Sequence, residues 1–558
     1  MSLFSSLSTS RRNLLGLILF FGIAFAFRTG TYPLLNPDEG RYAEIPREMV
    51  AGNDWITPRL NGVNYFEKPP LMYWAEAMSF TVLGNNETAA RAVPALFALL
   101  GVLLTYYAVR KLYGEDAGLA SAVVLGSSLL YAAHARIVII DMAVSVLMSW
   151  TLFSFILGIK EKVGPQRRYF FMQLYISAAL ATLAKGLIGV LLTGAVMFLW
   201  LLIFNQWKRL RPLYLPSGLI VFLIIAAPWH ILVSGHNPTW VHRYFVYEHF
   251  QRFFSSVASR PGPWWYFIPV ILVGLFPWTG FLYPALKQSL QGGWAKRENN
   301  KETWFFVTWV VFIFLFFTKS HSKLVPYILP VFPPLAAIIG VWLAKTKSNT
   351  NTHLKKGLIA VSVFGTLLAA ALCVVVIKPN LARFSIDQAN AIRPIAFTLA
   401  AVLFWGILRI PYLASRRGTR ITVGALALVI AVFFGVFTYA APFIKPGTKG
   451  LALIVNETAR PTDRVLHYHE FFHDFTFYAS RTVDVVAFKG EIELEEDAAA
   501  QKNGHFIDEV QFRAAWKQPT RLFVVARRQD VRELFKDSTF HYYLLAQTQD
   551  HTLFSNQP

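Results

Sequence analysis

Charged residues are scarce in this chain of 558 residues, and acidic residues are the scarcer kind. Only 15% of the residues are charged, and 53 Lys and Arg stand against 32 Asp and Glu, which gives a formal net charge of +21. Soluble domains carry about a quarter charged residues, so this deficit excludes an ordinary soluble or disordered protein. The single cysteine, Cys373, excludes an intramolecular disulfide and a cysteine-based metal cluster. Apolar and aromatic residues are abundant instead, which indicates a protein solvated by lipid.

Apolar runs long enough to cross about 30 Å of hydrocarbon recur from the N-terminus to about residue 442. We expect about thirteen transmembrane helices from these runs. Their approximate ranges are 13–33, 89–109, 117–135, 137–159, 169–184, 186–204, 214–234, 264–283, 303–318, 326–344, 357–377, 394–411 and 421–441. The sequence therefore predicts a polytopic α-helical membrane protein.

Short clusters of Lys and Arg fall on every second connection between these runs, beginning with Arg11 and Arg12. Cytoplasmic loops carry such clusters, so the N-terminus is predicted to be cytoplasmic and the C-terminal tail to lie on the outer face. Cations scattered in this way do not form the single basic face that nucleic-acid binding requires. The first run contains the small residues Ala24 and Ala26, as a signal-peptide cleavage site would, but the many later spans favour an uncleaved anchor.

The composition changes after Pro446, where apolar runs shorten to strand length. Runs at 465–468, 483–487, 522–526 and 542–546 are separated by polar helical patterns, which predicts a soluble α/β domain. We therefore expect a transmembrane catalytic domain over 1–444 and an outer α/β domain over 445–558. The acidic stretch 491–497 is interpreted as a solvated loop or helix.

The segment 28–88 is the least membrane-like part before the tail, and it holds two groups of charged residues. Asp38 and Glu39 follow an Asn-Pro turn at the expected start of a helix over 42–49, where carboxylates are favoured. They could cap that helix, act in catalysis, or do both. Glu67 and Lys68 precede a short amphipathic run at 71–74, which indicates an interfacial helix. Lys68 could hold a phosphate and Glu67 could bind a divalent metal, or the two could form a surface ion pair.

Three ionisable residues, Arg136, Asp141 and Lys185, fall inside or at the ends of the predicted spans. Ionisable groups there are costly and mark functional sites, although the two cations could also extend to the membrane surface. In the predicted outer loop 235–263, His242 and His249 could complete a metal site with Glu67, or could be ordinary solvated histidines. The outer turn that begins at Thr318 could hold an anion or cap two helices.

Three motifs resemble those of a known family. The runs NPDEGRYAEIPREM at 36–49, YFEKPP at 65–70 and SKL with YILP at 322–330 resemble the 4-amino-4-deoxy-L-arabinose transferases of lipid A, which are GT-C glycosyltransferases related to protein O-mannosyltransferases. The likeness extends over essentially the whole chain, including the span number and a C-terminal α/β domain. It implies transfer of aminoarabinose from undecaprenyl phosphate to a lipid A phosphate at the outer leaflet of the bacterial inner membrane, with resistance to polymyxin.

The resemblance also implies roles for individual residues. Asp38 matches the catalytic carboxylate, with Glu39 and Arg41 beside it in the motif. The positions that it implies for the donor phosphate are Lys68, Arg252 and Tyr327. Those implied for the sugar are Tyr42 and Tyr65, those for the acceptor cavity are Asp141 and Lys185, and the one implied for a metal, zinc or magnesium, is Glu67. His249 is a further candidate metal ligand from the residue pattern of its loop alone.

These roles predict a single displacement at the anomeric carbon, in which cations stabilise the leaving lipid phosphate. Asp38 would orient the aminosugar if the acceptor is a phosphate, or act as a base if it is a hydroxyl of another lipid, glycan or protein. That second acceptor class is the main alternative. A non-enzymatic lipid transporter fits less well, because the notable ionisable residues gather on one face and no repeat is visible. No cofactor is expected to be obligatory, and a monomer is expected.

Overall fold

The computed structural model describes residues 8–244, 260–346, 352–382, 384–444, 447–488 and 505–558. The chain divides into two compact units. The helical unit comprises Met1–Thr29, Glu67–Met72 and Arg91–Ala440, and the mixed unit comprises Gly30–Phe66, Tyr73–Ala90 and Ala441–Pro558. Segments from both ends of the chain thus build the mixed unit, whereas the boundary predicted at 444/445 follows chain order and stays a prediction.

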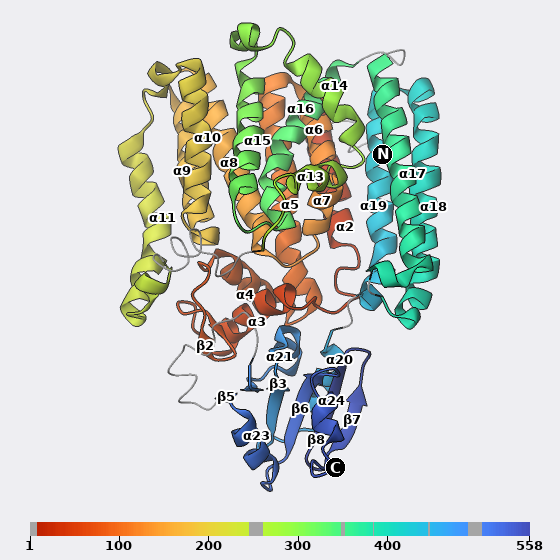
Figure 1. The fold of residues 1–558 in the computed structure, drawn as a ribbon. Helices are drawn as coiled ribbons and strands as arrows, with labels where there is room; N and C mark the ends of the chain where they lie inside the picture. The colour runs from red at the N-terminus through yellow and green to blue at the C-terminus, as the bar shows by residue number, and fades with distance from the viewer. Residues whose placement is uncertain (1–7, 245–259, 347–351, 383, 445–446, 489–504) are drawn as a thin grey trace. The chain divides into compact units, whose positions relative to one another are not determined.

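Helices make up the helical unit, which Figure 1 shows with α8, α9 and α10 side by side. Its first helices are α2 (Thr9–Ala26), α5 (Glu87–Tyr113), α6 (Glu115–Gly126), α7 (Leu129–His134), α8 (Ile140–Lys160), α9 (Pro165–Lys185), α10 (Ile188–Phe204) and α11 (Leu215–His236). Those that follow are α13 (Phe267–Gly274), α14 (Thr279–Ser289), α15 (Lys301–Lys319), α16 (Phe332–Lys345), α17 (Thr352–Ile377), α18 (Ile386–Arg417) and α19 (Thr419–Ile444). Every apolar range predicted to span the membrane falls on one or two of these helices.

Within the described residues, eight helices are long and apolar enough to cross a membrane. The pair α13 and α14, bent by 102°, raises this number to nine if it forms one span. The polytopic helical fold is therefore confirmed, while the number of thirteen spans stays a prediction. The 17-residue α10 falls below the usual length of a span, and α6 and α7 divide one predicted span into two short helices.

Burial separates central from peripheral helices in this unit. In α8, 94% of the apolar window is buried by protein, against 22% in α11 and in α17. An apolar helix covered on all sides belongs to the core, whereas one with an uncovered apolar surface suits contact with lipid. Gly340 of α16 lies so close to the backbone of Ser121 in α6 that a methyl group would overlap it, which explains how these two helices pack tightly. The central α8 thus gives Asp141, at its first turn, a fixed position.

The mixed unit is built on a six-stranded sheet in the order β5-β4-β3-β6-β8-β7. The strands are β3 (Arg464–Tyr468), β4 (Asp484–Val486), β5 (Phe506–Ile507), β6 (Leu522–Arg527), β7 (Tyr543–Gln547) and β8 (His551–Ser555). β3, β4, β5 and β6 run parallel, and β8 pairs antiparallel with β6 and β7. The four predicted strands are confirmed. β5 and β8 were missed, because the two residues of β5 are too few for a pattern and β8 follows β7 after a polar turn of three residues, 548–550.

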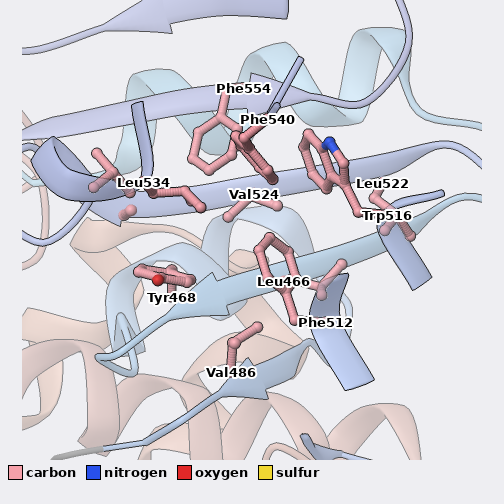
Figure 2. Packing of buried hydrophobic residues seen from close by; sticks show 12 residues of the cluster. Leu466, Tyr468, Val486, Phe512, Trp516, Leu522, Val524, Leu534, Phe540 and Phe554 are labelled. Carbon is pink, nitrogen blue, oxygen red and sulfur yellow. The ribbon is translucent and has the colours of Figure 1, made fainter. Parts of the chain in front are cut away.

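The remaining elements of this unit are helices and a separate two-stranded hairpin. They are α3 (Asp38–Ala51), the β1 (Arg59–Leu60) and β2 (Val63–Asn64) hairpin, α4 (Leu71–Leu83), which begins in the helical unit, α20 (Lys449–Thr458), α21 (His473–Ala479), α23 (Glu509–Trp516) and α24 (Arg532–Lys536). Figure 2 shows the core on one face of the sheet, where Val524 and Phe554 are fully buried. Trp516 stacks on Phe540 there with ring centroids 4.8 Å apart. This aromatic core fixes β6 and β8 as a rigid support.

Candidate functional site

The first predicted motif forms the start of α3 in the mixed unit. α3 begins at Asp38, four residues earlier than predicted, so both acidic residues of the motif lie in its first turn, where the helix dipole favours them. The Asp38 carboxylate accepts a hydrogen bond from the Arg41 guanidinium at 2.5 Å. Its side chain is 54% exposed, against 17% for Arg41. Asp38 is thus a solvent-facing carboxylate held by one cation, which is open to an incoming ligand.

Glu39, also predicted as catalytic, has a different environment. It is buried, and its carboxylate accepts a hydrogen bond from the backbone N–H of Leu35 at 2.8 Å. This bond closes the turn that leads into α3, so Glu39 shapes the backbone next to Asp38. Its predicted catalytic role stays a prediction.

The two tyrosines predicted for the sugar both lie in the mixed unit. Tyr42 is 7% exposed and stacks on Tyr73 of α4, with ring centroids 6.1 Å apart. The Arg41 guanidinium lies 5.4 Å from the Tyr42 ring centroid, a cation–π distance. Tyr65 is 4% exposed and its backbone N–H donates to the carbonyl of Pro58 at 2.8 Å. Both tyrosine side chains are thus buried and fixed by their surroundings in the protein.

A residue of the C-terminal part, Asp474, fixes the turn in front of Asp38. Asp474 is fully buried on α21, and its carboxylate accepts hydrogen bonds from the Asn36 side-chain amide and from the backbone N–H of Thr448, the latter at 2.6 Å. In return its own N–H donates to the Asn36 side-chain oxygen at 3.2 Å. Burial raises the pKa of Asp474 to about 6, and the hydrogen bonds from Thr448 limit the rise.

The close approach of α21 to α3 also explains Gly40. A Cβ atom on Gly40 would lie 2.5 Å from the backbone nitrogen of Asp474 and 2.8 Å from the carbonyl carbon of His473. Only glycine allows the two helices to meet at this distance. Sequence reasoning missed Asp474, because an aspartate 438 residues from its partner carries no local signal.

Glu44 and Glu76 of this unit are also buried. Glu44 forms a fully buried pair with Arg47, whose Nε and Nη2 donate to its two carboxylate oxygens at 2.6 and 2.8 Å. Glu76 of α4 is also fully buried, and neither of its carboxylate oxygens has a hydrogen-bond partner among the described residues. Burial, with a smaller contribution from Glu39, raises the pKa of Glu76 well above its usual range. Its position therefore favours the neutral, protonated form of Glu76.

In the helical unit, three predicted site residues from distant parts of the sequence come together. Lys185, at the last turn of α9, donates a hydrogen bond to the carboxylate of Asp141, at the first turn of α8, at 2.5 Å. The helix dipoles favour the carboxylate and the ammonium at these respective ends. The Lys185 ammonium also lies 4.8 Å from the ring centroid of Tyr327, in the 3-10 helix η4 (Val325–Val331). Both charged side chains keep about a sixth of their surface exposed, at 17% and 15%, so a ligand can reach them.

Lys68 and Glu67 lie in the segment between the β1–β2 hairpin and α4. The Lys68 ammonium is 4.0 Å from the Glu67 carboxylate and donates to the Glu67 carbonyl at 3.0 Å. Within the part of the chain that the structure describes, no three His, Cys, Asp or Glu side chains gather as a metal site. A lysine beside Glu67 also disfavours a cation there, so the described residues do not by themselves make the predicted metal site. Arg252 and His249 lie outside the described residues.

Arg136 has a structural role that the sequence did not indicate. Its guanidinium donates to the carbonyl of Ala24 at 2.6 Å and also to those of Phe25 and Phe27. The last carbonyls of a helix lack partners within the helix, and Arg136 satisfies those of α2. It does not extend to a membrane surface, since it is only 4% exposed.

Comparison with known proteins assigns this arrangement to a family. A family model described as dolichyl-phosphate-mannose-protein mannosyltransferase matches residues 67–231. An undecaprenyl phosphate-alpha-4-amino-4-deoxy-L-arabinose arabinosyl transferase of Proteus mirabilis is 30% identical over 402 residues, which cover 72% of this chain and 71% of the relative. A relative of the same description from Aeromonas hydrophila is 30% identical over 423 residues, which cover 74% and 75%.

The fold agrees with these relatives. The crystal structure of ArnT from Cupriavidus metallidurans bound to undecaprenyl phosphate matches with a TM-score of 0.88 at 27% identity, and the match covers 97% of both chains. The family resemblance expected from the three motifs is therefore confirmed, as are the GT-C fold, the membrane character and the glycosyltransferase class. The chain belongs to the family of undecaprenyl phosphate-α-4-amino-4-deoxy-L-arabinose arabinosyl transferases.

Proposed function

We propose that the chain transfers 4-amino-4-deoxy-L-arabinose from undecaprenyl phosphate to a phosphate group of lipid A. The observation that carries this proposal is the match over 97% of both chains to a protein crystallised with undecaprenyl phosphate. The cluster of Asp141, Lys185 and Tyr327 supports it, because an accessible ammonium at a helix end suits a phosphate-bearing lipid. The product would carry fewer uncompensated negative charges, which would lower the affinity of polymyxin and other cationic peptides.

The reaction is a single displacement. An oxygen of the lipid A phosphate attacks the anomeric carbon as the bond from that carbon to the undecaprenyl phosphate oxygen breaks. Negative charge then develops on the leaving phosphate, and preorganised cations stabilise it most effectively. We assign this task to Lys68, Arg252 and the hydroxyl of Tyr327.

Asp38 has a different task in this reaction. A lipid A phosphate is already ionised near pH 7, so the attack requires no strong base. We assign the exposed Asp38 carboxylate to the ammonium of the aminosugar, with Arg41 holding the carboxylate and Tyr42 and Tyr65 lining the sugar. The proposed mechanism has no step that uses a metal. Addition of a chelator to the transfer assay tests the predicted zinc or magnesium at Glu67 and His249.

The proposed location follows from the substrate. Undecaprenyl phosphate and lipid A meet at the outer leaflet of the bacterial inner membrane, so the acidic and basic residues of the site belong on the periplasmic side. The alternation of basic clusters supports a cytoplasmic N-terminus and a periplasmic C-terminal domain. A monomer suffices for this arrangement.

Transfer in proteoliposomes that contain only the purified chain, the aminoarabinose donor and lipid A tests the proposal. Asp38→Asn should lower transfer by at least tenfold, whereas Asp387→Asn, which removes an exposed carboxylate at the start of α18, should leave it unchanged. Normal transfer by Asp38→Asn would refute the role of Asp38. Transfer to an acceptor hydroxyl, but not to lipid A, would favour the alternative acceptor class.

A further inference from the structure

A large cleft in the mixed unit is not used by the proposed reaction. It has a volume of about 970 Å³ and lies among β6, α24 and the turn between β7 and β8. Its wall is formed by Arg527, Arg528, Gln529, Val531, Arg532, Phe535 and Lys536, by Gln547, Gln549, Asp550, His551 and Thr552, and by Glu470, Phe471 and Phe472. Asn36, Pro37 and Gly447 complete it. The volume falls in the range of sites for whole organic ligands and far exceeds the space that one inorganic ion requires.

The cations of this cleft are unequally compensated. Arg527 is paired with Glu470 at 3.1 Å and with Asp530 at 2.7 Å, and Lys536 is paired with Glu533 at 2.6 Å. These charges are therefore engaged within the protein.

Arg528 and Arg532 are exposed and form no ion pair with a carboxylate in the described part of the chain. Within the described residues, the Arg528 side chain donates a hydrogen bond to the carbonyl of Gln549 at 3.3 Å, and this neutral acceptor leaves its charge uncompensated. The acidic residues of the wall are the paired Glu470 and a single exposed aspartate, Asp550. Two guanidinium groups thus face one free carboxylate, and the cleft favours an anion.

The other groups of the wall narrow the class of anion. A guanidinium binds a phosphate through two parallel hydrogen bonds, so Arg528 and Arg532 suit phosphate oxygens. The amides of Gln529, Gln547 and Gln549 can both donate and accept, as sugar hydroxyls require. A phosphorylated saccharide matches both groups and also the volume.

The position of the cleft links it to the reaction. Asn36 and Pro37 are part of its wall, and Asp38 is the next residue along the chain. The hydrogen bonds from Asn36 to the buried Asp474 hold this end of the wall in place. A ligand in the cleft therefore contacts the turn that carries the predicted catalytic carboxylate.

We propose that this cleft binds the phosphorylated saccharide headgroup of the acceptor lipid, an inference that rests on the proposed function. The C-terminal sheet would then select the acceptor in addition to supporting the fold. Electrostatic attraction contributes to binding, so the affinity should fall as ionic strength rises.

Calorimetric binding to the full chain in nanodiscs, without donor, tests this proposal. The probe is the deacylated, bisphosphorylated glucosamine disaccharide of lipid A, and inorganic phosphate is the second probe. The double variant Arg528→Gln/Arg532→Gln should bind the disaccharide about tenfold more weakly, which corresponds to about 1.4 kcal/mol. The control Arg460→Gln/Lys517→Gln removes two exposed cations of the same unit outside the cleft, and should change the affinity less than twofold.

Each outcome decides the proposal. Equal affinities of the double variant and the control would overturn it, as would inorganic phosphate that binds as tightly as the disaccharide. Arginine-dependent binding in a chain that fails to transfer the sugar would leave the cleft as a phosphosaccharide site while refuting the proposed function. If the double variant transferred the sugar to lipid A with an unchanged KM for the acceptor, the proposed function would stand and the assignment of the cleft to the acceptor would be refuted.

Discussion

Replacement of Asp474 by alanine tests whether the C-terminal part holds the predicted catalytic turn in position. The substitution leaves two donors, the half-buried Asn36 amide and the buried Thr448 N–H, without their acceptor. A hydrogen bond to a charged group contributes about 1.5–3 kcal/mol, so the two losses total roughly 3–6 kcal/mol.

Removal of the buried charge offsets part of this loss. Burial raises the pKa of Asp474 from 3.8 to about 6 even with its hydrogen bonds in place, so loss of the carboxylate also relieves a cost of the ionised form at neutral pH. The net destabilisation of the mixed unit is therefore smaller than the roughly 3–6 kcal/mol of the two hydrogen bonds, and the larger effect should be local. We expect the backbone amides of residues 34–41 to lose protection from hydrogen exchange, and transfer to fall about tenfold or more.

Hydrogen exchange and transfer, measured on the full chain in detergent, provide the assay. Asp463→Ala is the matched control, because Asp463 is a partly exposed aspartate of the same unit whose carboxylate accepts a hydrogen bond from the backbone N–H of Arg460, away from the turn. If Asp474→Ala retained both the protection of residues 34–41 and the normal rate, the turn would not depend on Asp474.

Asp474 should also make the stability of the mixed unit depend on pH. Because its folded pKa is raised, its contribution to stability is greatest below about pH 4 and is lost as the pH rises to about 6, and Asp474→Asn should remove this dependence.

Three further substitutions in the mixed unit have defined outcomes. Gly40→Ala should cost about 1–3 kcal/mol and lower the unfolding temperature, because the new methyl group meets the backbone of Asp474 at 2.5 Å; a variant with an unchanged unfolding temperature would show that α3 and α21 can separate freely. Arg47→Ala should destabilise the unit by about 3–5 kcal/mol in denaturant unfolding, since the fully buried Glu44 would lose both hydrogen bonds from its guanidinium partner; a loss below 1 kcal/mol would contradict this. Glu76→Gln should flatten the decline in stability that the raised pKa causes as the pH rises above about 4.5, and a pH series of thermal unfolding identical to that of the unmodified chain would exclude this role.

Much of the helical fold could be predicted from sequence, because membrane spans are long and their apolar composition is dictated by the lipid. The strand β6 was likewise evident from five consecutive apolar residues. Arg136 was not predicted correctly, since its task depends on carbonyls more than a hundred residues away. The short β5 and the turn-linked β8 lack a pattern that a single sequence can display.

The candidate site likewise contains residues that the sequence could indicate and residues that only the structure reveals. An ionisable residue inside an apolar run stands out in the sequence, and Asp141 and Lys185 were selected in this way. In the structure these two residues pair with each other. Glu39 and Asp38 are adjacent in sequence, yet one is buried and the other exposed, a difference that composition does not encode. Asp474 and the cleft arise from contacts between segments about 400 residues apart, which only the fold displays.

The most direct test of the central claim is mass spectrometry of lipid A from polymyxin-sensitive cells that make the aminoarabinose donor and express this chain. We expect lipid A species that carry one or more added aminoarabinose groups on phosphate, and the absence of these species when Asp38→Ala is expressed to the same level. Lipid A of unchanged mass in cells with the unmodified chain, or equal modification by Asp38→Ala, would contradict that claim.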